Sequence, residues 1–440
     1  RNSTASRPRV SLTLAECPPD NEWVDLSGTG QPNWLYAHLQ PGSTHHDPEL
    51  SSLQMPGCHG QCCHLGGAVI RIKNTISTTV ACLFMHMVFA QHAHTTEQPA
   101  ISQADLDELV GEHSLFSGSV IVAQEGEPVA QVHHGFADRN SGRKNSSQTL
   151  YSIASVGKMF TAVAIVQLVE ANKLRYETPV VDIIPELAEK IGGSITVDHL
   201  LRHTSGIGRI SGVDDATLNS LASNTDYFAL VVSKGIGSDG PGDFSYRNEN
   251  YQVLGEIIAR VSGQTYETYV RERIAKPTGM MGPVFDPGER GDDIAHHYMA
   301  VDFETWWNSE ESIVANNADE FIHRAPQSTP SAGGGAYVTA MDMIKFAAAL
   351  RSGVLVSPES LRHMCPADFN RPIDKRRYGR GCSVESGPRY VRTGHTGSTA
   401  GIQARFYLYP ERGIDVIVLS NHDEQAAPVF REIDRLIQAH

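Results

Sequence analysis

A nearly all-apolar run from Met159 to Val169 follows directly on the tetrad Ser155-Val-Gly-Lys158. A run of this kind predicts a helix that is buried on all sides, so the segment belongs in the core of the molecule. The serine stands at the first turn of that helix, and the lysine returns to nearly the same face after a rise of about 4.5 Å. A second tetrad, Ser141-Gly-Arg-Lys144, opens no apolar run and is predicted to be a polar loop.

Ser155 and Lys158 are a candidate nucleophile and base. A serine hydroxyl is a poor nucleophile until a neighbouring group takes its proton, and a lysine can do so when burial or a nearby cation favours its neutral form. The amino terminus of the helix also directs N–H groups and the positive end of its dipole toward an oxyanion formed at the serine. The tetrad alone is a weak signal, because Ser-x-x-Lys also arises by chance, as Ser141 shows.

The loop segment Tyr246-Arg-Asn248 carries side chains that suit the same chemistry. A tyrosine can relay a proton to the leaving group, and an asparagine amide can hold a substrate carbonyl while it bonds the lysine. Taken singly, Tyr246 has the alternative of being a packed core tyrosine.

The segment His395-Thr-Gly397-Ser398 is expected just before a strand that begins at Ala400. Its glycine and small side chains would let a substrate lie along the strand edge, so that the Ser398 N–H faces the same oxyanion as the Ser155 N–H. Taken singly, His395 has the alternative of being a hydrogen-bonded loop histidine.

The charge and the missing motifs exclude several function classes. A net charge of −14 and a pI near 5.8 provide no basic stripe for nucleic-acid phosphates. The chain has no Gly-x-Ser-x-Gly elbow, no His-Glu-x-x-His helix and no Gly-x-x-x-x-Gly-Lys phosphate loop. The pairs His133-His134 and His296-His297 are predicted to be solvated histidines, and no metal or other cofactor is expected.

Predicted strands gather at both ends of residues 101–440, and predicted helices fill the middle. Strands are expected at 117–124 and 128–133, around a hairpin, and at 402–408 and 414–419. Helices are expected at 101–113, 160–171, 197–202, 251–261, 266–274, 340–350 and 426–438. The fold class is therefore α/β (α+β), with one antiparallel sheet built from both ends of the domain, flanking helices and a mostly helical insertion.

The segment before residue 101 is expected to lie outside this domain. Residues 69–90 are predicted to be a secretory signal peptide, with Arg71 and Lys73 before an apolar run that ends at Val88-Phe89-Ala90. The run is too short for a stable membrane span. Residues 1–68 are expected to be upstream or disordered sequence, with translation starting near Val69 and a periplasmic or secreted product.

The cysteines are unevenly placed along the chain. Cys17, Cys58, Cys62, Cys63 and Cys82 precede residue 100, and only Cys365 and Cys382 follow it. A disulfide-rich scaffold is therefore not predicted for the main body. The cluster from Cys58 to His64 holds zinc-ligand residue types, but no second ligand pair at finger spacing follows, so no zinc site is predicted.

Taken together, these motifs resemble the serine β-lactamase and penicillin-binding protein superfamily. The likeness is to its class C-like branch of D-aminopeptidases, alkaline D-peptidases and family VIII carboxylesterases, and it covers about residues 101–440. The markers stand in the family's order: Ser155-Val-Gly-Lys158, Leu200-Leu-Arg-His203-Thr-Ser-Gly206, Tyr246-Arg-Asn248, Gly333-Gly-Gly335 and His395-Thr-Gly397. Five ordered markers make coincidence a poor explanation.

The resemblance implies a role for each site residue. Ser155 would be the acylated nucleophile, Lys158 its general base and Tyr246 the second acid or base. Substrate would contact Asn248, His395, Gly397 and Ser398, and the N–H groups of Ser155 and Ser398 would form the oxyanion hole. The segment from His203 to Gly206 is expected to be structural, as a helix end closed by Gly206.

The third motif departs from the Lys-Thr-Gly of many β-lactamases and transpeptidases, because His395 replaces the lysine. Histidine is mostly neutral at pH 7, so the fixed positive charge for a substrate carboxylate is lost. The expected function is hydrolysis of short-chain esters or small amides through an acyl-enzyme, with weak β-lactam hydrolysis allowed. The open alternatives are a class C-type β-lactamase, a D-Ala-D-Ala carboxypeptidase or D-aminopeptidase, and a penicillin-binding receptor that is acylated without turnover.

Overall fold

The computed structural model describes residues 23–25, 36–38 and 100–440, apart from gaps at 211, 214–216, 218–219, 235, 303–304, 306–314, 316, 326–328 and 367–376. The chain divides into two units, residues 1–97 and 98–440. In the first unit, the described residues are the antiparallel strands β1 (Trp23–Asp25) and β2 (Tyr36–His38). The predicted signal peptide at 69–90 and the rest of 1–68, with its Cys58–His64 cluster, lie outside the described residues.

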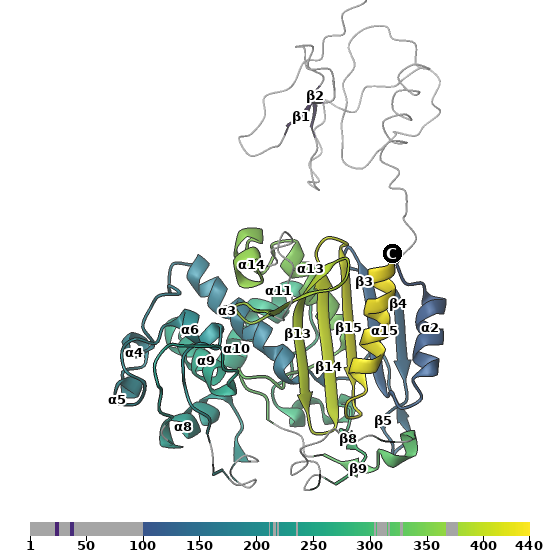
Figure 1. Cartoon of the computed structure of the whole chain (residues 1–440), viewed down its shortest axis with the longest axis horizontal. Coiled ribbons are helices and arrows are strands. Elements are labelled where there is room, and N and C mark those ends of the chain that lie inside the picture. The colour runs from purple at the N-terminus through teal and green to yellow at the C-terminus, as the bar shows by residue number, and fades with distance from the viewer. Residues whose placement is uncertain are drawn as a thin grey trace, which may run out of the picture. The chain divides into compact units, whose positions relative to one another are not determined.

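The second unit is built on one antiparallel sheet with the strand order β11-β12-β13-β14-β15-β3-β4 (Figure 1). Its strands are β3 (Gly118–Gln124), β4 (Glu127–His134), β11 (Arg377–Tyr378), β12 (Ser383–Ser386), β13 (Val391–Thr399), β14 (Ile402–Tyr409) and β15 (Ile414–Ser420). The last strand, β15, lies between β14 and β3, the first strand of the sheet. This confirms the predicted sheet built from both ends of the domain.

The alternation of side chains along the strands divides the interior into two cores. Ile121 on β3 and Ile417 on β15 point to the larger core, under the helical insertion. Their neighbours Val120 and Val418 point to the smaller core, under the terminal helices. Successive strand residues face opposite sides, so strands that are apolar throughout serve both cores, and each buried valine or isoleucine contributes roughly 1.5–3 kcal/mol.

Two terminal helices cover one face of the sheet (Figure 1). Helix α2 (Gln103–Glu112) begins at Ser102, whose side chain forms a capping box with Asp105, and it packs on β4. Helix α15 (Ala426–Ala439) packs on β14 and β15 with its apolar side. Both helices confirm the sequence-based predictions at 101–113 and 426–438 to within a few residues.

The helical insertion lies on the other face and beside the sheet. Its helices are α3 (Lys158–Glu170), α4 (Val180–Ile183), α5 (Ala188–Ile191), α6 (Val197–Leu201), α8 (Asn224–Lys234), α9 (Asn248–Ser262), α10 (Tyr266–Val270), α11 (Lys276–Thr278), α13 (Ala340–Arg351) and α14 (Pro358–Met364). As predicted, α3 is a core helix, since every residue from Lys158 to Val166 is buried.

Among the described residues of the second unit, three short strand pairs form separate two-stranded sheets. The pairs are β7 (Tyr151–Ser152) with β10 (Tyr337–Val338), β5 (Phe136–Asp138) with β6 (Arg143–Lys144), and β8 (Tyr298–Met299) with β9 (His323–Arg324). A disulfide joins Cys365, at the end of α14, to Cys382, just before β12.

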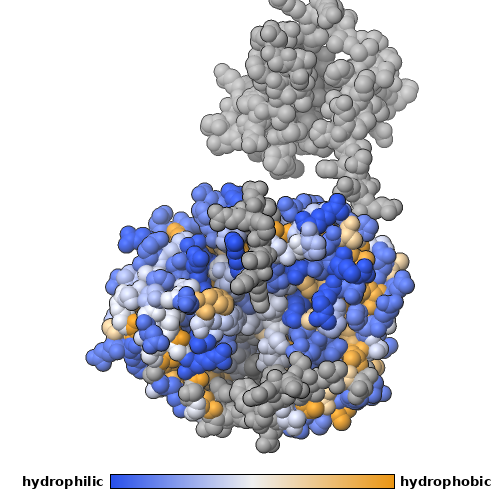
Figure 2. Space-filling view, in the orientation of Figure 1, coloured by the Kyte–Doolittle hydropathy of each residue, from blue (hydrophilic) through white to orange (hydrophobic). Residues whose placement is uncertain are grey.

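Figure 2 shows a face of the molecule on which hydrophilic residues dominate among the described residues and apolar residues form smaller groups. None of the helices in the described residues has the length and apolar character needed to cross a bilayer.

Candidate active site

Ser155 lies in a tight turn that connects β7 to α3. The 3-10 turn η2 (Ala154–Gly157) leads directly into the helix, and Ala154 has a φ of +43°, which is uncommon for a residue other than glycine. Two backbone hydrogen bonds hold the turn, from the N–H of Gly335 to Ala154 and from the N–H of Ile153 to Ala336. Ser155 is partly exposed while its neighbours on both sides are buried, so the turn presents the hydroxyl outward.

Lys158, in the first turn of α3, is fully buried and directs its amine at Ser155. Its Nζ lies 3.2 Å from Ser155 Oγ and 2.8 Å from Asn248 Oδ1, and it also donates to the carbonyl of Gly333. The rings of Tyr246 and Tyr251 lie near it, with centroids 4.9 and 5.5 Å from Nζ. The predicted pair and two of the predicted motifs therefore meet at one nitrogen.

The partners of Lys158 determine what its amine can do. The amide oxygen of Asn248 and the carbonyl of Gly333 can only accept hydrogen bonds. In the neutral amine, the two hydrogens go to these acceptors, and the lone pair is left for the Ser155 hydroxyl. This is the arrangement that a general base for the serine requires.

Tyr246 approaches the same amine from the loop before α9. Its ring lies 4.3 Å from the ring of His203 and 6.3 Å from that of His395, measured between centroids. Asn248, the first residue of α9, is exposed apart from its contact with Lys158. The sequence Tyr246-Arg-Asn248 thus places a phenol and an amide beside the lysine.

The ring of His203 packs against the ring of Tyr246 and is neutral. Its Nδ1 accepts hydrogen bonds from the Arg247 N–H at 3.2 Å and from Asn250 Nδ2 at 3.1 Å. Burial lowers the pKa of His203 to about 2. The His203 ring that packs against Tyr246 is therefore uncharged and adds no positive charge to the site.

The predicted role of Gly206 as the end of a helix was wrong. Helix α6 ends at Leu201, with Arg202 as its C-cap, and His203 takes the left-handed conformation, with a φ of +58°. Gly206 is needed for a different reason: a Cβ there would lie 2.1 Å from the carbonyl oxygen of Gly240. Its φ of +67° and this close backbone approach both favour glycine.

The third motif precedes a strand as the sequence predicted, although that strand, β14, begins at Ile402 and not at Ala400. The motif itself lies inside β13, a strand that the sequence-based prediction missed. A Cβ on Gly397 would lie 2.2 Å from the carbonyl of Ile153 and 3.1 Å from the nitrogen of Ser155, so the strand touches the nucleophile turn. Strand β12 pairs with β13 only as far as Gly394. Within the described residues, no strand pairs with the outer edge of 395–399, where Gly397 is buried and Ser398 exposed.

His395 is buried in this strand, and both its ring nitrogens have hydrogen-bond partners. Nδ1 lies 2.5 Å from the carbonyl oxygen of Thr396, and Nε2 lies 3.0 Å from the hydroxyl of Tyr378. The sequence-based prediction missed Tyr378, which stands between the second and third motifs. The sequence signal is weak, because Tyr378 is one tyrosine among 14 and is separated from His395 by 17 residues.

The remaining candidates lie elsewhere. Ser141 stands in the polar turn between β5 and β6, and its Oγ donates to Asp138 at 2.7 Å, in agreement with the predicted loop. His297 is buried, so its prediction as a solvated residue was wrong. In the described part of the chain, no group of three or more His, Cys, Asp or Glu side chains is placed to hold a metal ion.

A serine set against a buried lysine at the start of a core helix, beside an antiparallel sheet, defines the class of β-lactamase-like proteins with a Ser-x-x-Lys site. Residues 103–440 match the Beta-lactamase family model, and the chain belongs to this family. The resemblance drawn from the five motifs is therefore confirmed. Serine hydrolases are typical of this family.

Individual relatives come from several functional groups. PbpX of Bacillus subtilis, named for penicillin binding, is 33% identical over 62% of this chain; the match covers 63% of PbpX, less than two thirds of its length. Esterase EstB of Burkholderia gladioli is 28% identical over 59% of this chain and 71% of EstB. The crystal structure of a penicillin-binding protein from Bacillus halodurans superposes with a TM-score of 0.62 at 26% identity, covering 75% of this chain and 98% of that one.

Proposed function

We propose that the protein is a serine hydrolase that acts through an acyl-enzyme at Ser155 on short-chain esters or small amides. The observation that carries this proposal is the position of Lys158 Nζ, 3.2 Å from Ser155 Oγ, with two partners that can only accept. A serine with its base in hydrogen-bond reach is equipped for nucleophilic attack.

The reaction proceeds in two halves. In the first, Ser155 Oγ bonds to the substrate carbonyl carbon as its proton passes to Lys158, and the carbonyl oxygen becomes an oxyanion facing the N–H groups of Ser155 and Ser398. The bond to the leaving group then breaks, and that group takes a proton relayed through Tyr246. In the second, water attacks the acyl carbon, gives its proton to the same base, and releases the acid and Ser155.

The substrate class rests on the third motif. His395 replaces a lysine, and histidine is mostly neutral at pH 7, so the motif offers no fixed positive charge for a carboxylate. The esterase relative EstB supports esters as substrates. Esters and amides without a carboxylate near the scissile carbonyl are therefore the leading substrates, and β-lactams, which carry one, are weak substrates.

A second candidate function is favoured by the penicillin-binding relatives. The likeness to PbpX, which is named for penicillin binding, supports penicillin as a ligand. The alternative functions are therefore a β-lactamase, a D-Ala-D-Ala carboxypeptidase or a D-aminopeptidase, and a receptor that is acylated without turnover. Lys158, Tyr246 and Asn248 gathered at Ser155 argue against a receptor, because such a protein needs no machinery for release.

One set of assays separates these functions. The protein is incubated with p-nitrophenyl butyrate, nitrocefin and D-alanine p-nitroanilide, and its intact mass is then measured. We expect the butyrate ester to be hydrolysed fastest; a stable mass adduct without product would instead indicate a receptor. Ser155→Ala should abolish every reaction, whereas the control Ser141→Ala should keep full activity. Activity that survives in Ser155→Ala would contradict the proposed nucleophile.

We also propose that the protein is exported to the periplasm or the medium. The disulfide between Cys365 and Cys382 supports this location, because such bonds persist in oxidising compartments. Cell fractionation, with mass spectrometry of the native amino terminus, tests the proposal. A reduced protein found only in the cytoplasm would reject it.

A further inference from the structure

Tyr378 stands where the second and third motifs meet. Its ring centroid lies 4.9 Å from that of His203, 6.1 Å from that of Tyr246 and 5.6 Å from that of His395. Its hydroxyl lies 3.0 Å from His395 Nε2. Tyr378 therefore contacts His203, which packs against the candidate acid Tyr246, and also contacts His395 of the third motif.

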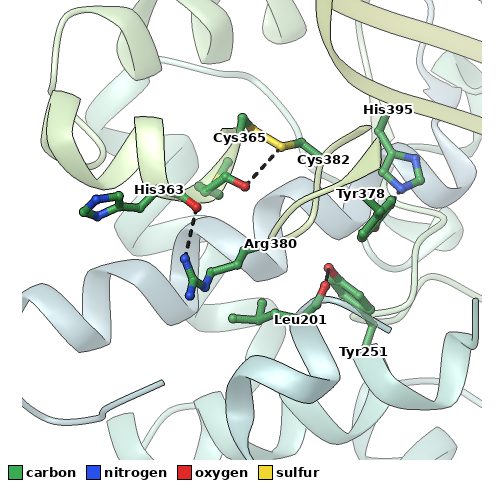
Figure 3. The surroundings of a disulfide bond; sticks show 9 residues. Leu201, Tyr251, His363, Cys365, Tyr378, Arg380, Cys382 and His395 are labelled. Atoms are coloured by element: carbon green, nitrogen blue, oxygen red, sulfur yellow. Dashed lines mark hydrogen bonds between the residues drawn. A yellow bond between two sulfur atoms is a disulfide. The ribbon is translucent and has the colours of Figure 1, made fainter. Parts of the chain in front are cut away.

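The turn that carries Tyr378 is fixed on several sides. The disulfide between Cys365 and Cys382 ties it to the end of α14, as Figure 3 shows. Arg380 donates to Asp198 at 2.6 Å and to the carbonyl of His363 at 3.0 Å. A Cβ on Gly381 would lie 2.3 Å from Ala162 Cβ, so the turn packs directly on α3. These contacts of the turn fix the position of Tyr378.

The partners of His395 assign its hydrogen atoms. The carbonyl of Thr396 can only accept, so the nitrogen facing it, Nδ1, carries a hydrogen. A neutral ring with its hydrogen on Nδ1 leaves Nε2 as an acceptor, and the Tyr378 hydroxyl, 3.0 Å away, is a group that can donate to it. Such a hydrogen bond stabilises this neutral tautomer.

We propose that Tyr378 is a positioning residue that holds His395 as the neutral Nδ1–H tautomer and thereby keeps the third motif uncharged. The substrates selected are esters and amides with no carboxylate on the side that faces β13. This consequence for substrates rests on the proposed hydrolase function; the tautomer itself does not.

The tautomer is tested by nitrogen NMR without any substrate. The protein is labelled with 15N-histidine, and the signals of His395 are identified by their loss in His395→Gln. At neutral pH, we expect one protonated nitrogen, Nδ1, and one unprotonated nitrogen, Nε2. A doubly protonated ring, or a hydrogen on Nε2, would overturn the proposal even if the protein hydrolyses no ester. In Tyr378→Phe, the Nε2 signal should shift, because its hydrogen-bond donor is gone.

The selectivity is tested with two esters of similar size, p-nitrophenyl butyrate and mono-p-nitrophenyl succinate. Tyr378→Phe should lower kcat/KM for butyrate by about fivefold, as expected for one lost hydrogen bond, and should raise the succinate-to-butyrate ratio of kcat/KM. A purely structural role would lower both values in proportion, and an unchanged ratio would overturn the selectivity. The matched control is Tyr390→Phe. The hydroxyl of Tyr390 contacts Arg412 away from the site, so its loss should leave the ratio unchanged.

Discussion

Lys158 illustrates how one residue can be fully buried and still suit catalysis. A buried amine is costly unless it is hydrogen bonded, and here Asn248 and Gly333 supply acceptors while Tyr246 and Tyr251 supply ring faces. Tyr246, Asn248 and Tyr251 come from one segment and Gly333 from another, and both segments are distant from Lys158 in the sequence. The lysine is therefore set in place only when these two segments have packed around α3.

A substitution at His395 tests the charge argument at the same scale. In His395→Lys, a positive charge would face the substrate from the third motif, so the rate of nitrocefin hydrolysis relative to p-nitrophenyl butyrate should rise about tenfold, as for one hydrogen bond to a charged group. The measurement is kcat/KM for both compounds. The control His395→Gln removes the imidazole without adding charge and should give no such gain. Equal behaviour of the two variants would refute the charge argument.

At the level of residues, the sequence predicted the contacts that have fixed spacing and missed those that depend on packing. Ser155 and Lys158 could be paired because helix geometry sets their separation. Tyr378 could not be found, because its partner His395 is reached only across two strands of the folded sheet. His297 was predicted to be solvated, but its burial depends on segments distant in sequence.

Among the elements, β13 lies in direct contact with the turn before α3 that carries Ser155. Gly397 permits this contact because a Cβ there would lie 2.2 Å from the carbonyl of Ile153. In Gly397→Ala, the strand and the turn must move apart, which should misplace the two oxyanion N–H groups and lower the rate of acylation about 100-fold.

Single-turnover kinetics with p-nitrophenyl butyrate measures this effect. The control is Gly111→Ala in α2, where an added Cβ meets no atom within 4 Å. Acylation that stays near the wild-type rate in Gly397→Ala, with the fold intact, would show that the strand does not set the geometry of the oxyanion hole.

Elements with continuous apolar or amphipathic patterns were predicted well, and β13 was not. Strands β3 and β15 each have a continuous apolar run at their centre, and α3 is mostly apolar around its circumference, so each is recognisable from its own residues. In β13, Gly394 and Gly397 interrupt the pattern, and glycine weakens a strand in isolation. That strand forms because β14 pairs with it along its length from Thr393 to Thr399.

For the molecule as a whole, Asp423 links stability to pH. Burial raises the pKa of Asp423 to about 7, while its carboxylate accepts the Gly401 N–H at 2.7 Å. The folded protein therefore keeps a proton that the unfolded chain releases near pH 4, at about the ordinary pKa of aspartic acid. Between these values the unfolded state binds fewer protons, so the free energy of unfolding falls as the pH rises.

Replacing the carboxyl removes this dependence. Asp423→Asn keeps an acceptor for Gly401 but has no proton to release, so it should be more stable than the wild type at pH 7 by on the order of 2 kcal/mol. The difference should vanish at pH 4. Urea unfolding at both values measures it, with the exposed Asp107→Asn as control. A stability difference that is the same at both pH values would contradict the assignment.

The position of β15 between β14 and β3 has a consequence for how the chain is made. The sheet cannot close until the carboxyl-terminal residues have left the ribosome, because its first strand pairs with its last. Such high contact order slows folding and leaves the nascent polypeptide open for longer. The chain would therefore still be unfolded when synthesis ends, and it could then pass through a secretion channel that accepts only unfolded polypeptides.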